Sequence, residues 1–248
     1  MTVPSPSRSL VALIVEDAPE VAGLLETLLT NEGFDVFWAG TGKAALLAAQ
    51  ELGPDVIVLD TVLADLDGLE VCRQIRSFSD AYVVMVSIRS DEVDRLLGLS
   101  IGADDFLAHP FSPNDLVARI RAMLRRPRLL THKVRLLPDG TPVVKVHGDL
   151  VIDIDAREVT LAGQSIELTR IEFDLLAVLA TNPRTVFSRS RLLEFVWGPN
   201  WFGDTHVVDV HVSNLRRKLG DTDRPEPFIQ TVRGVGFRLI GGAAPTDS

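Results

Sequence analysis

The stretch Gly102-Ala-Asp-Asp-Phe-Leu-Ala-His-Pro-Phe111 decides how the front half of the chain folds. Within it, residues 105–108 are predicted to form a short buried strand that delivers His109 directly before Pro110. Four further apolar runs precede it, at residues 11–15, 34–38, 56–59 and 82–86. Helical periods lie between and after the strands, at residues 19–31, 42–52, 69–76, 91–100 and 116–126. This alternation predicts an α/β fold built on a doubly wound, five-stranded parallel sheet.

Polar side chains follow four of these strands at the point where each one ends. Glu16 and Asp17 end the first strand, Asp60 the third, Ser87 the fourth and His109 the fifth. Ligands bind at the carboxyl ends of strands in such sheets, so we expect these side chains to converge. Clustered carboxylates repel one another unless a cation joins them, and oxygen ligands suit Mg²⁺. The pattern predicts a Mg²⁺ site beside an Asp60 carboxylate that can attack a phosphoryl group, with Ser87 donating a hydrogen bond to it.

The 248 residues divide into two halves of different charge. Residues 1–125 contain nine Lys or Arg against nineteen Asp or Glu, whereas residues 126–248 contain sixteen against fifteen. The excess acid therefore lies in the front half, and the back half can attract phosphates locally. Pro127 ends the last front-half helix. We expect a disordered N-terminus over residues 1–8, a first domain over 9–126, a linker over 127–142, a second domain over 143–242 and a tail over 243–248.

The composition excludes several classes of protein. The single Cys72 rules out a disulfide framework, and it lies at an apolar position that favours packing over redox chemistry. No segment approaches the roughly 20 apolar residues that would cross a bilayer. We expect a cytoplasmic protein with no membrane partner.

Short strands precede three helices in the back half. The strands are expected at residues 143–146, 150–154, 158–161 and 165–168, and Thr169-Arg-Ile-Glu172 is a capping box that opens the first helix. Residues 189–196 form the second helix and residues 205–219 the third. A buried stripe on the third helix comprises Val208, Val212, Leu215 and Leu219.

The other side of that third helix carries the chemistry expected of a base-reading surface. Its predicted outward face comprises His206, Val210, Ser213, Asn214 and Arg217, with His211 and Arg216 on the flanks. Arginine can reach guanine, asparagine can pair with adenine and valine can meet a thymine methyl in the major groove of double-stranded DNA. The chain then ends in a predicted hairpin over residues 228–239 with Arg233-Gly234 at its tip.

Nearly the whole chain resembles the OmpR/PhoB group of two-component response regulators, which join a receiver of the flavodoxin-like α/β fold to an α+β winged helix-turn-helix domain. The resemblance implies that a sensor histidine kinase phosphorylates Asp60 and that Glu16, Asp17 and the Val62 carbonyl hold the metal with it. Phe106 matches the switch aromatic that turns inward with Ser87. It also implies a cis bond between His109 and Pro110.

The same resemblance implies how the protein assembles and binds. Two pairs of residues match intersubunit ion pairs of a receiver homodimer: Arg95 with Asp115, and Asp105 with Arg119. Arg233 matches the wing arginine that enters the minor groove. Trp201 and Phe202 lie in the loop where the family contacts the DNA backbone or RNA polymerase. A dimer on tandem half-sites is expected.

Four positions of the receiver half depart from the family pattern, and in the back half His206 replaces an arginine. His109 replaces a lysine, Thr61 and Val62 replace an aliphatic and a Met-like residue, and Ala64 replaces a proline. An imidazole has a reference pKa of about 6.5 and is mostly neutral at pH 7, so we expect weaker phosphoryl binding. Two readings stay open, an ordinary phosphorylation switch and a phosphorylation-independent dimerisation module.

Two other classes of protein are disfavoured. A phosphoryl-transfer enzyme lacks a substrate-pocket signature, so we expect no catalysis beyond the receiver's own phosphorylation and dephosphorylation. An interaction module without DNA binding is opposed by Arg233 and the third-helix face.

Overall fold

The computed structural model describes residues 9–88, 92–124, 144–199, 201, 205–222 and 224–240. The chain divides into two compact units, residues 1–120 and 121–248, called the N-terminal and C-terminal units below. The predicted N-terminal segment, the linker over residues 127–142 and the tail lie outside the described residues. Among the described residues, no helix combines the length and the apolar character needed to cross a bilayer.

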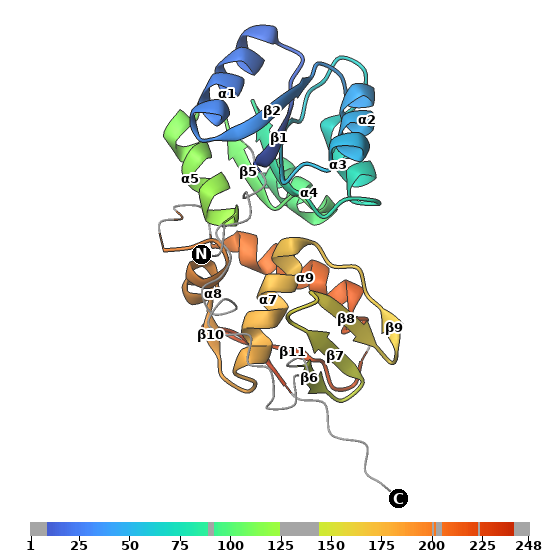
Figure 1. Cartoon of the computed structure of the whole chain (residues 1–248). Coiled ribbons are helices and arrows are strands. Elements are labelled where there is room, and N and C mark those ends of the chain that lie inside the picture. Colours follow the sequence, from blue (N-terminus) through green and yellow to red (C-terminus); the bar gives the residue numbers. More distant parts are fainter. Residues whose placement is uncertain are drawn as a thin grey trace, which may run out of the picture. The chain divides into compact units, whose positions relative to one another are not determined.

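The N-terminal unit is the predicted parallel sheet with helices on both faces. Its five strands have the order β2-β1-β3-β4-β5, and every neighbouring pair is parallel. Figure 1 shows α1 and α5 on one side of this sheet and α2 and α3 on the other. The elements are β1 (Leu10–Val15), α1 (Pro19–Asn31), β2 (Phe34–Ala39), α2 (Gly42–Leu52), β3 (Val56–Asp60), α3 (Gly68–Ile75), β4 (Tyr82–Ser87), α4 (Glu92–Ile101), β5 (Asp105–Ala108) and α5 (Pro113–Leu124).

The central strands form the core of this unit. Strands covered by helices on both faces are expected to be continuously apolar, and Leu13, Leu59 and Met85 from β1, β3 and β4 are fully buried. The edge strand β2 is more exposed and includes two half-exposed aromatics, Phe37 and Trp38. The predicted elements are present with small shifts, of which the largest is that α5 begins at Pro113, three residues earlier than expected.

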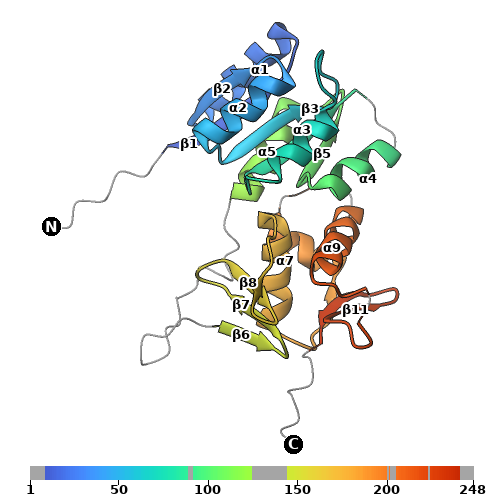
Figure 2. The ribbon, with the colours of Figure 1, turned by 90° about the vertical axis from the view of Figure 1, so that its right-hand side faces the viewer.

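In its described residues, the C-terminal unit contains two small antiparallel sheets and three helices. The first sheet has the order β6-β7-β8-β9 and the second β10-β12-β11. Figure 2 shows the β11–β12 hairpin next to α9. The elements are β6 (Val144–His147), β7 (Leu150–Asp153), β8 (Glu158–Leu161), β9 (Gln164–Ser165), α7 (Arg170–Thr181), β10 (Phe187–Ser188), α8 (Arg189–Val196), α9 (His206–Lys218), β11 (Ile229–Val232) and β12 (Gly236–Leu239).

The capping box at Thr169 is confirmed, and it explains one wrong prediction nearby. The Thr169 hydroxyl accepts a hydrogen bond from the Glu172 amide, and the Glu172 carboxylate accepts one from the Thr169 amide. The strand predicted over residues 165–168 is only the two residues of β9. After one further backbone bond, from Ile166 to Val159, the chain leaves the sheet to enter this cap.

Candidate functional site

Three carboxylates meet at the carboxyl edge of the parallel sheet. Glu16 and Asp17 follow β1, and Asp60 ends β3, the neighbouring strand. One oxygen from each lies within 4.8 Å of the other two. Glu16 is buried, Asp60 is half-buried and Asp17 is exposed, so the cluster opens to solvent on one side.

The cluster is electrostatically strained in the absence of a counter-charge. Burial raises the pKa of Glu16, and the charges of Asp60 and Asp17 raise it further, while a hydrogen bond from the Ala18 amide opposes both effects. Burial also raises the pKa of Asp60, partly offset by the amide of Val62, which lies 3.0 Å from one carboxylate oxygen. A divalent cation would offset the repulsion, and an all-oxygen donor set fits Mg²⁺.

The backbone of Asp60 and Thr61 packs closely against the start of α3, and this contact fixes its position. Gly68, the first residue of α3, lies against it: a Cβ at this position would be 2.2 Å from the Asp60 carbonyl oxygen. The Gly68 amide donates to the Thr61 carbonyl at 3.0 Å, and Asp67 caps α3 by accepting from the Leu69 amide. Only glycine therefore allows α3 to begin at this distance from Asp60.

The next two strand ends bring Ser87 and His109 to the same edge. Ser87 is buried, and its hydroxyl accepts a hydrogen bond from the Thr61 hydroxyl at 2.8 Å. The main-chain carbonyl of Ser87 accepts a hydrogen bond from the His109 amide at 2.8 Å. The His109 side chain, when charged, lowers the pKa of Asp60, although by less than burial raises it. The imidazole lies 4.6 Å from the Phe111 ring, and the predicted cis bond between His109 and Pro110 is confirmed.

The exposed face of α9 differs in part from the predicted one. His206, Ser213 and Arg217 are exposed and Val210 is half-buried, as expected for an outward face. The predicted exposure of two other residues is wrong, because His211 is 1% and Asn214 is 3% exposed. The buried face of α9 is therefore wider than the face that the residue spacing predicts. On this flank the His211 ring lies 5.6 Å from the ring of Trp197, which follows α8.

Arg216 is bonded to the neighbouring hairpin. Its guanidinium donates to the Ile229 carbonyl at 2.7 Å and to the Thr231 hydroxyl at 2.8 Å. It also lies 5.7 Å from the centre of the Phe237 ring, and burial lowers its pKa. Predicted as a DNA contact, Arg216 instead uses its donors to tie α9 to β11.

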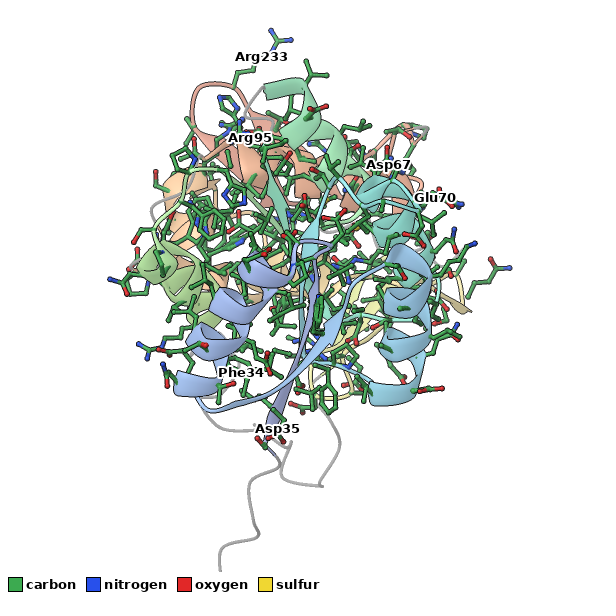
Figure 3. The ribbon with its side chains drawn as sticks, turned by 90° about the horizontal axis from the view of Figure 1, so that it is seen from above. Phe34, Asp35, Asp67, Glu70, Arg95 and Arg233 are labelled. Atoms are coloured by element: carbon green, nitrogen blue, oxygen red, sulfur yellow. The ribbon has the colours of Figure 1, made fainter. Side chains whose placement is uncertain are left out.

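The hairpin presents a single cation at its tip. Arg233 is exposed in the turn between β11 and β12, and Figure 3 shows its side chain extending away from the ribbon. Gly236 opens β12 where a Cβ would lie 1.9 Å from the Phe187 carbonyl oxygen, which locks the hairpin to β10. The unit thus offers an exposed helix face and an exposed hairpin arginine, the two kinds of surface that read DNA grooves.

Comparisons with known proteins match both units. The response regulator receiver domain family matches residues 12–121, and the family described as transcriptional regulatory protein, C terminal, matches residues 163–239. The DNA-binding response regulator MtrA of Mycolicibacterium smegmatis is 43% identical over 226 residues, 91% of this chain and 95% of the relative. The chain is a DNA-binding response regulator of the OmpR/PhoB type.

Two further relatives agree with this assignment. The transcriptional regulatory protein PhoP of Bacillus subtilis, named for alkaline phosphatase synthesis, is 39% identical over 228 residues, 92% of this chain and 95% of the relative. A solved structure of a RitR mutant has a TM-score of 0.77 and 28% identity, and the match covers 94% of this chain and all of that one. The response regulator is therefore a transcription factor with a receiver, and its family is not one of enzymes.

A buried aromatic and an open pocket lie on the side of the receiver that includes Ser87. Phe106, which matches the family's switch aromatic, is 7% exposed and belongs to the core cluster. A cavity of about 310 Å³ adjoins the Thr61–Ser87 pair. Its lining residues are Thr61, Val62, Leu63, Asp67, Leu69, Ser87 and Asp94.

Arg119 links two of the other charged residues assigned to the receiver dimer within one chain. The Arg119 guanidinium contacts Asp105 at 2.9 Å and Asp115 at 3.1 Å. Asp105 is buried, whereas Arg95 on α4 is half-buried. The resemblance had paired Asp115 with Arg95, but in the single chain it contacts Arg119.

Two residues near the acidic cluster were not predicted as part of it. Thr61 departs from the family pattern and carries no predicted role, yet its hydroxyl donates a hydrogen bond to the Ser87 hydroxyl. Trp38 was not singled out, and its indole nitrogen donates to the Glu16 carbonyl at 2.8 Å. Neither contact has a sequence signal, because each joins strand ends that are distant along the chain.

Proposed function

We propose that a partner sensor histidine kinase phosphorylates this regulator on Asp60 in the cytoplasm, and that phosphorylation controls DNA binding. The observation that carries the proposal is the meeting of three carboxylates within 4.8 Å at the strand ends of a receiver. Glu16, Asp17 and Asp60, with the carbonyl of Val62, would hold Mg²⁺. The bound ion would supply positive charge that offsets the repulsion between the carboxylates and an incoming phosphoryl group.

The chain's own residues would carry out the transfer as follows. An Asp60 oxygen attacks the phosphorus of the kinase's phosphohistidine, so that a P–O bond forms as the P–N bond breaks and the electron pair returns to the imidazole. Ser87 donates a hydrogen bond to a phosphoryl oxygen. His109 provides a second donor, and in its imidazolium form a positive charge.

Phosphorylation would favour a receiver homodimer that places two winged-helix domains on tandem half-sites of double-stranded DNA. The charged set on α4, β5 and α5, Arg95, Asp105, Asp115 and Arg119, would set the register of the dimer. Surface ion pairs each contribute about 0 to 1 kcal/mol, so they specify the dimer better than they stabilise it.

DNA would be bound by the exposed residues of α9 and the wing. His206, Val210, Ser213 and Arg217 would face the major groove, and Arg233 would enter the minor groove. The loop that contains Trp201 would contact the DNA backbone or RNA polymerase. Phe202, assigned to the same loop, lies outside the described residues.

The proposal is tested by incubating the full chain with acetyl phosphate and Mg²⁺. Intact-mass spectrometry should detect one added phosphoryl group, and light scattering should detect a shift toward dimer. Asp60→Asn is the matched control and should show neither change. A wild type that gains no phosphoryl mass over the pH range 6 to 8 would overturn the proposal.

A second candidate is a receiver that dimerises without phosphorylation. The observation that favours it is His109 in place of the family's lysine, since His109 lacks the permanent positive charge by which lysine would stabilise the phosphoryl group. In that case the same experiment would find dimers in the untreated protein and in Asp60→Asn.

A further inference from the structure

Trp38 is an unusual residue for its place in the fold. It lies one residue before the end of the edge strand β2 and is 49% exposed, although large aromatics mostly gain stability by burial. Its polar edge is used, because the indole Nε1 donates to the main-chain carbonyl of Glu16 at 2.8 Å. An exposed tryptophan is thus bonded directly to a residue of the acidic cluster.

The geometry of the β1–β2 ladder explains why the side chain makes this bond. The parallel pairing runs from Leu10 opposite Phe34 to Val15 opposite Ala39. One more backbone bond follows, from the Glu16 amide to the Ala39 carbonyl at 3.2 Å. β2 then ends, and the chain turns into α2, so the Glu16 carbonyl lies past the last strand residue. The indole takes the place of the missing ladder donor.

Three hydrogen bonds of Glu16 consequently fix the main chain of Glu16 and Asp17. The Glu16 amide is bonded to Ala39, its carbonyl to Trp38 and its carboxylate to the Ala18 amide at 3.0 Å. The peptide unit that joins Glu16 to Asp17 is planar, so fixing the carbonyl also fixes the plane that contains the Asp17 amide. Asp17 is exposed, and the aim of its carboxylate therefore depends strongly on this backbone.

We propose that Trp38 is a positioning residue of the cation site, which holds the Glu16–Asp17 main chain in the orientation that binds a divalent cation. The proposal rests on the proposed function in that it concerns the same Mg²⁺ site. It also makes Trp38 an intrinsic reporter, because the indole is bonded to the backbone of a cation ligand. The other two tryptophans, Trp197 and Trp201, belong to the C-terminal unit.

The test compares Mg²⁺ binding by calorimetry in the full-length wild type and in Trp38→Phe, which keeps an aromatic ring but removes the donor. Loss of one hydrogen bond should weaken Mg²⁺ binding about 3- to 10-fold. Phe37→Leu is the matched control, because Phe37 is a neighbouring aromatic on β2 with 43% exposure. This variant should bind Mg²⁺ like the wild type. Thermal unfolding of all three proteins shows whether each is folded.

Tryptophan emission gives a second readout that does not depend on the variant's stability. Mg²⁺ should change the emission of the wild type and of Phe37→Leu, but not that of Trp38→Phe. Equal Mg²⁺ affinity in the wild type and Trp38→Phe would overturn the inference, as would equal weakening in Phe37→Leu. If the wild type binds Mg²⁺ and Asp17→Asn does not, such a failure leaves the proposed metal site standing. Absence of binding in the wild type would overturn both.

Discussion

Replacing Gly68 by alanine should displace the phosphoacceptor. The new Cβ would lie 2.2 Å from the Asp60 carbonyl oxygen and 2.7 Å from the Thr61 Cα, where real Cβ atoms essentially never come within 3.0 Å. The backbone must therefore move by at least 0.8 Å, the difference between 3.0 and 2.2 Å. Forced overpacking of this kind costs about 1 to 3 kcal/mol of stability. A displacement near 1 Å costs up to about 100-fold in rate when reacting groups are misaligned.

The assay is the initial rate of phosphorylation by acetyl phosphate with Mg²⁺, followed by intact-mass spectrometry, with the unfolding free energy measured in urea. We expect the rate to fall about 10- to 100-fold in Gly68→Ala. Gly23→Ala is the matched control, because this exposed residue of α1 has no atom within 4 Å of its added Cβ. It should keep the rate and gain up to about 1 kcal/mol from helix propensity. A Gly68→Ala protein with wild-type rate and stability would refute the reasoning.

Three further predictions separate the roles of single residues. Because burial raises the pKa of Asp60, its ionised form destabilises the metal-free fold, and stability falls as pH rises from the ordinary carboxyl range of about 4 toward neutrality. Asp60→Asn should therefore raise the melting temperature of metal-free protein at pH 7 but not near pH 3; equal gains at both pH values would contradict this. Arg216→Ala should lower both stability and DNA affinity, whereas Arg217→Ala should lower affinity alone, by about 1 to 3 kcal/mol if it reads a base. Melting curves measure the stability and fluorescence anisotropy measures the affinity. If both variants melt at the same temperature, the hydrogen bonds of Arg216 to β11 do not stabilise the domain. His109→Lys should lengthen the lifetime of phosphorylated Asp60, because a permanent cation beside the phosphoryl group contributes about 1.5 to 3 kcal/mol. If the wild type and the variant have the same lifetime at pH 6 and also at pH 8, the substitution is neutral.

Periodicity and strand-end chemistry predicted the parallel sheet and the carboxylate cluster because both follow from local rules. A buried parallel strand is a short apolar run, and such strands place their carboxyl ends on one edge. Glu16, Asp17 and Asp60 could thus be brought together without knowledge of any contact. The Thr169 cap was readable for the same reason, since all of its partners lie within four residues.

The errors arise where a side chain's role depends on a neighbour from elsewhere in the chain. Helical spacing gives the angle of His211 on α9, but it does not reveal that Trp197 lies beside it. Arginine is a residue type that often contacts DNA, yet Arg216 donates hydrogen bonds to a carbonyl and a hydroxyl group of β11. Trp38 has no local motif at all, because its function is set by where β2 ends relative to Glu16.

The most direct test of the central claim is the effect of Asp60 phosphorylation on DNA affinity. A duplex with two tandem half-sites, selected from random DNA with the phosphorylated protein, would be titrated by fluorescence anisotropy with and without acetyl phosphate and Mg²⁺. Phosphorylation should tighten binding by the wild type about 5- to 150-fold, the usual range of allosteric coupling, and leave Asp60→Asn unchanged. Equal affinity of phosphorylated and unphosphorylated wild type for this duplex would contradict the account.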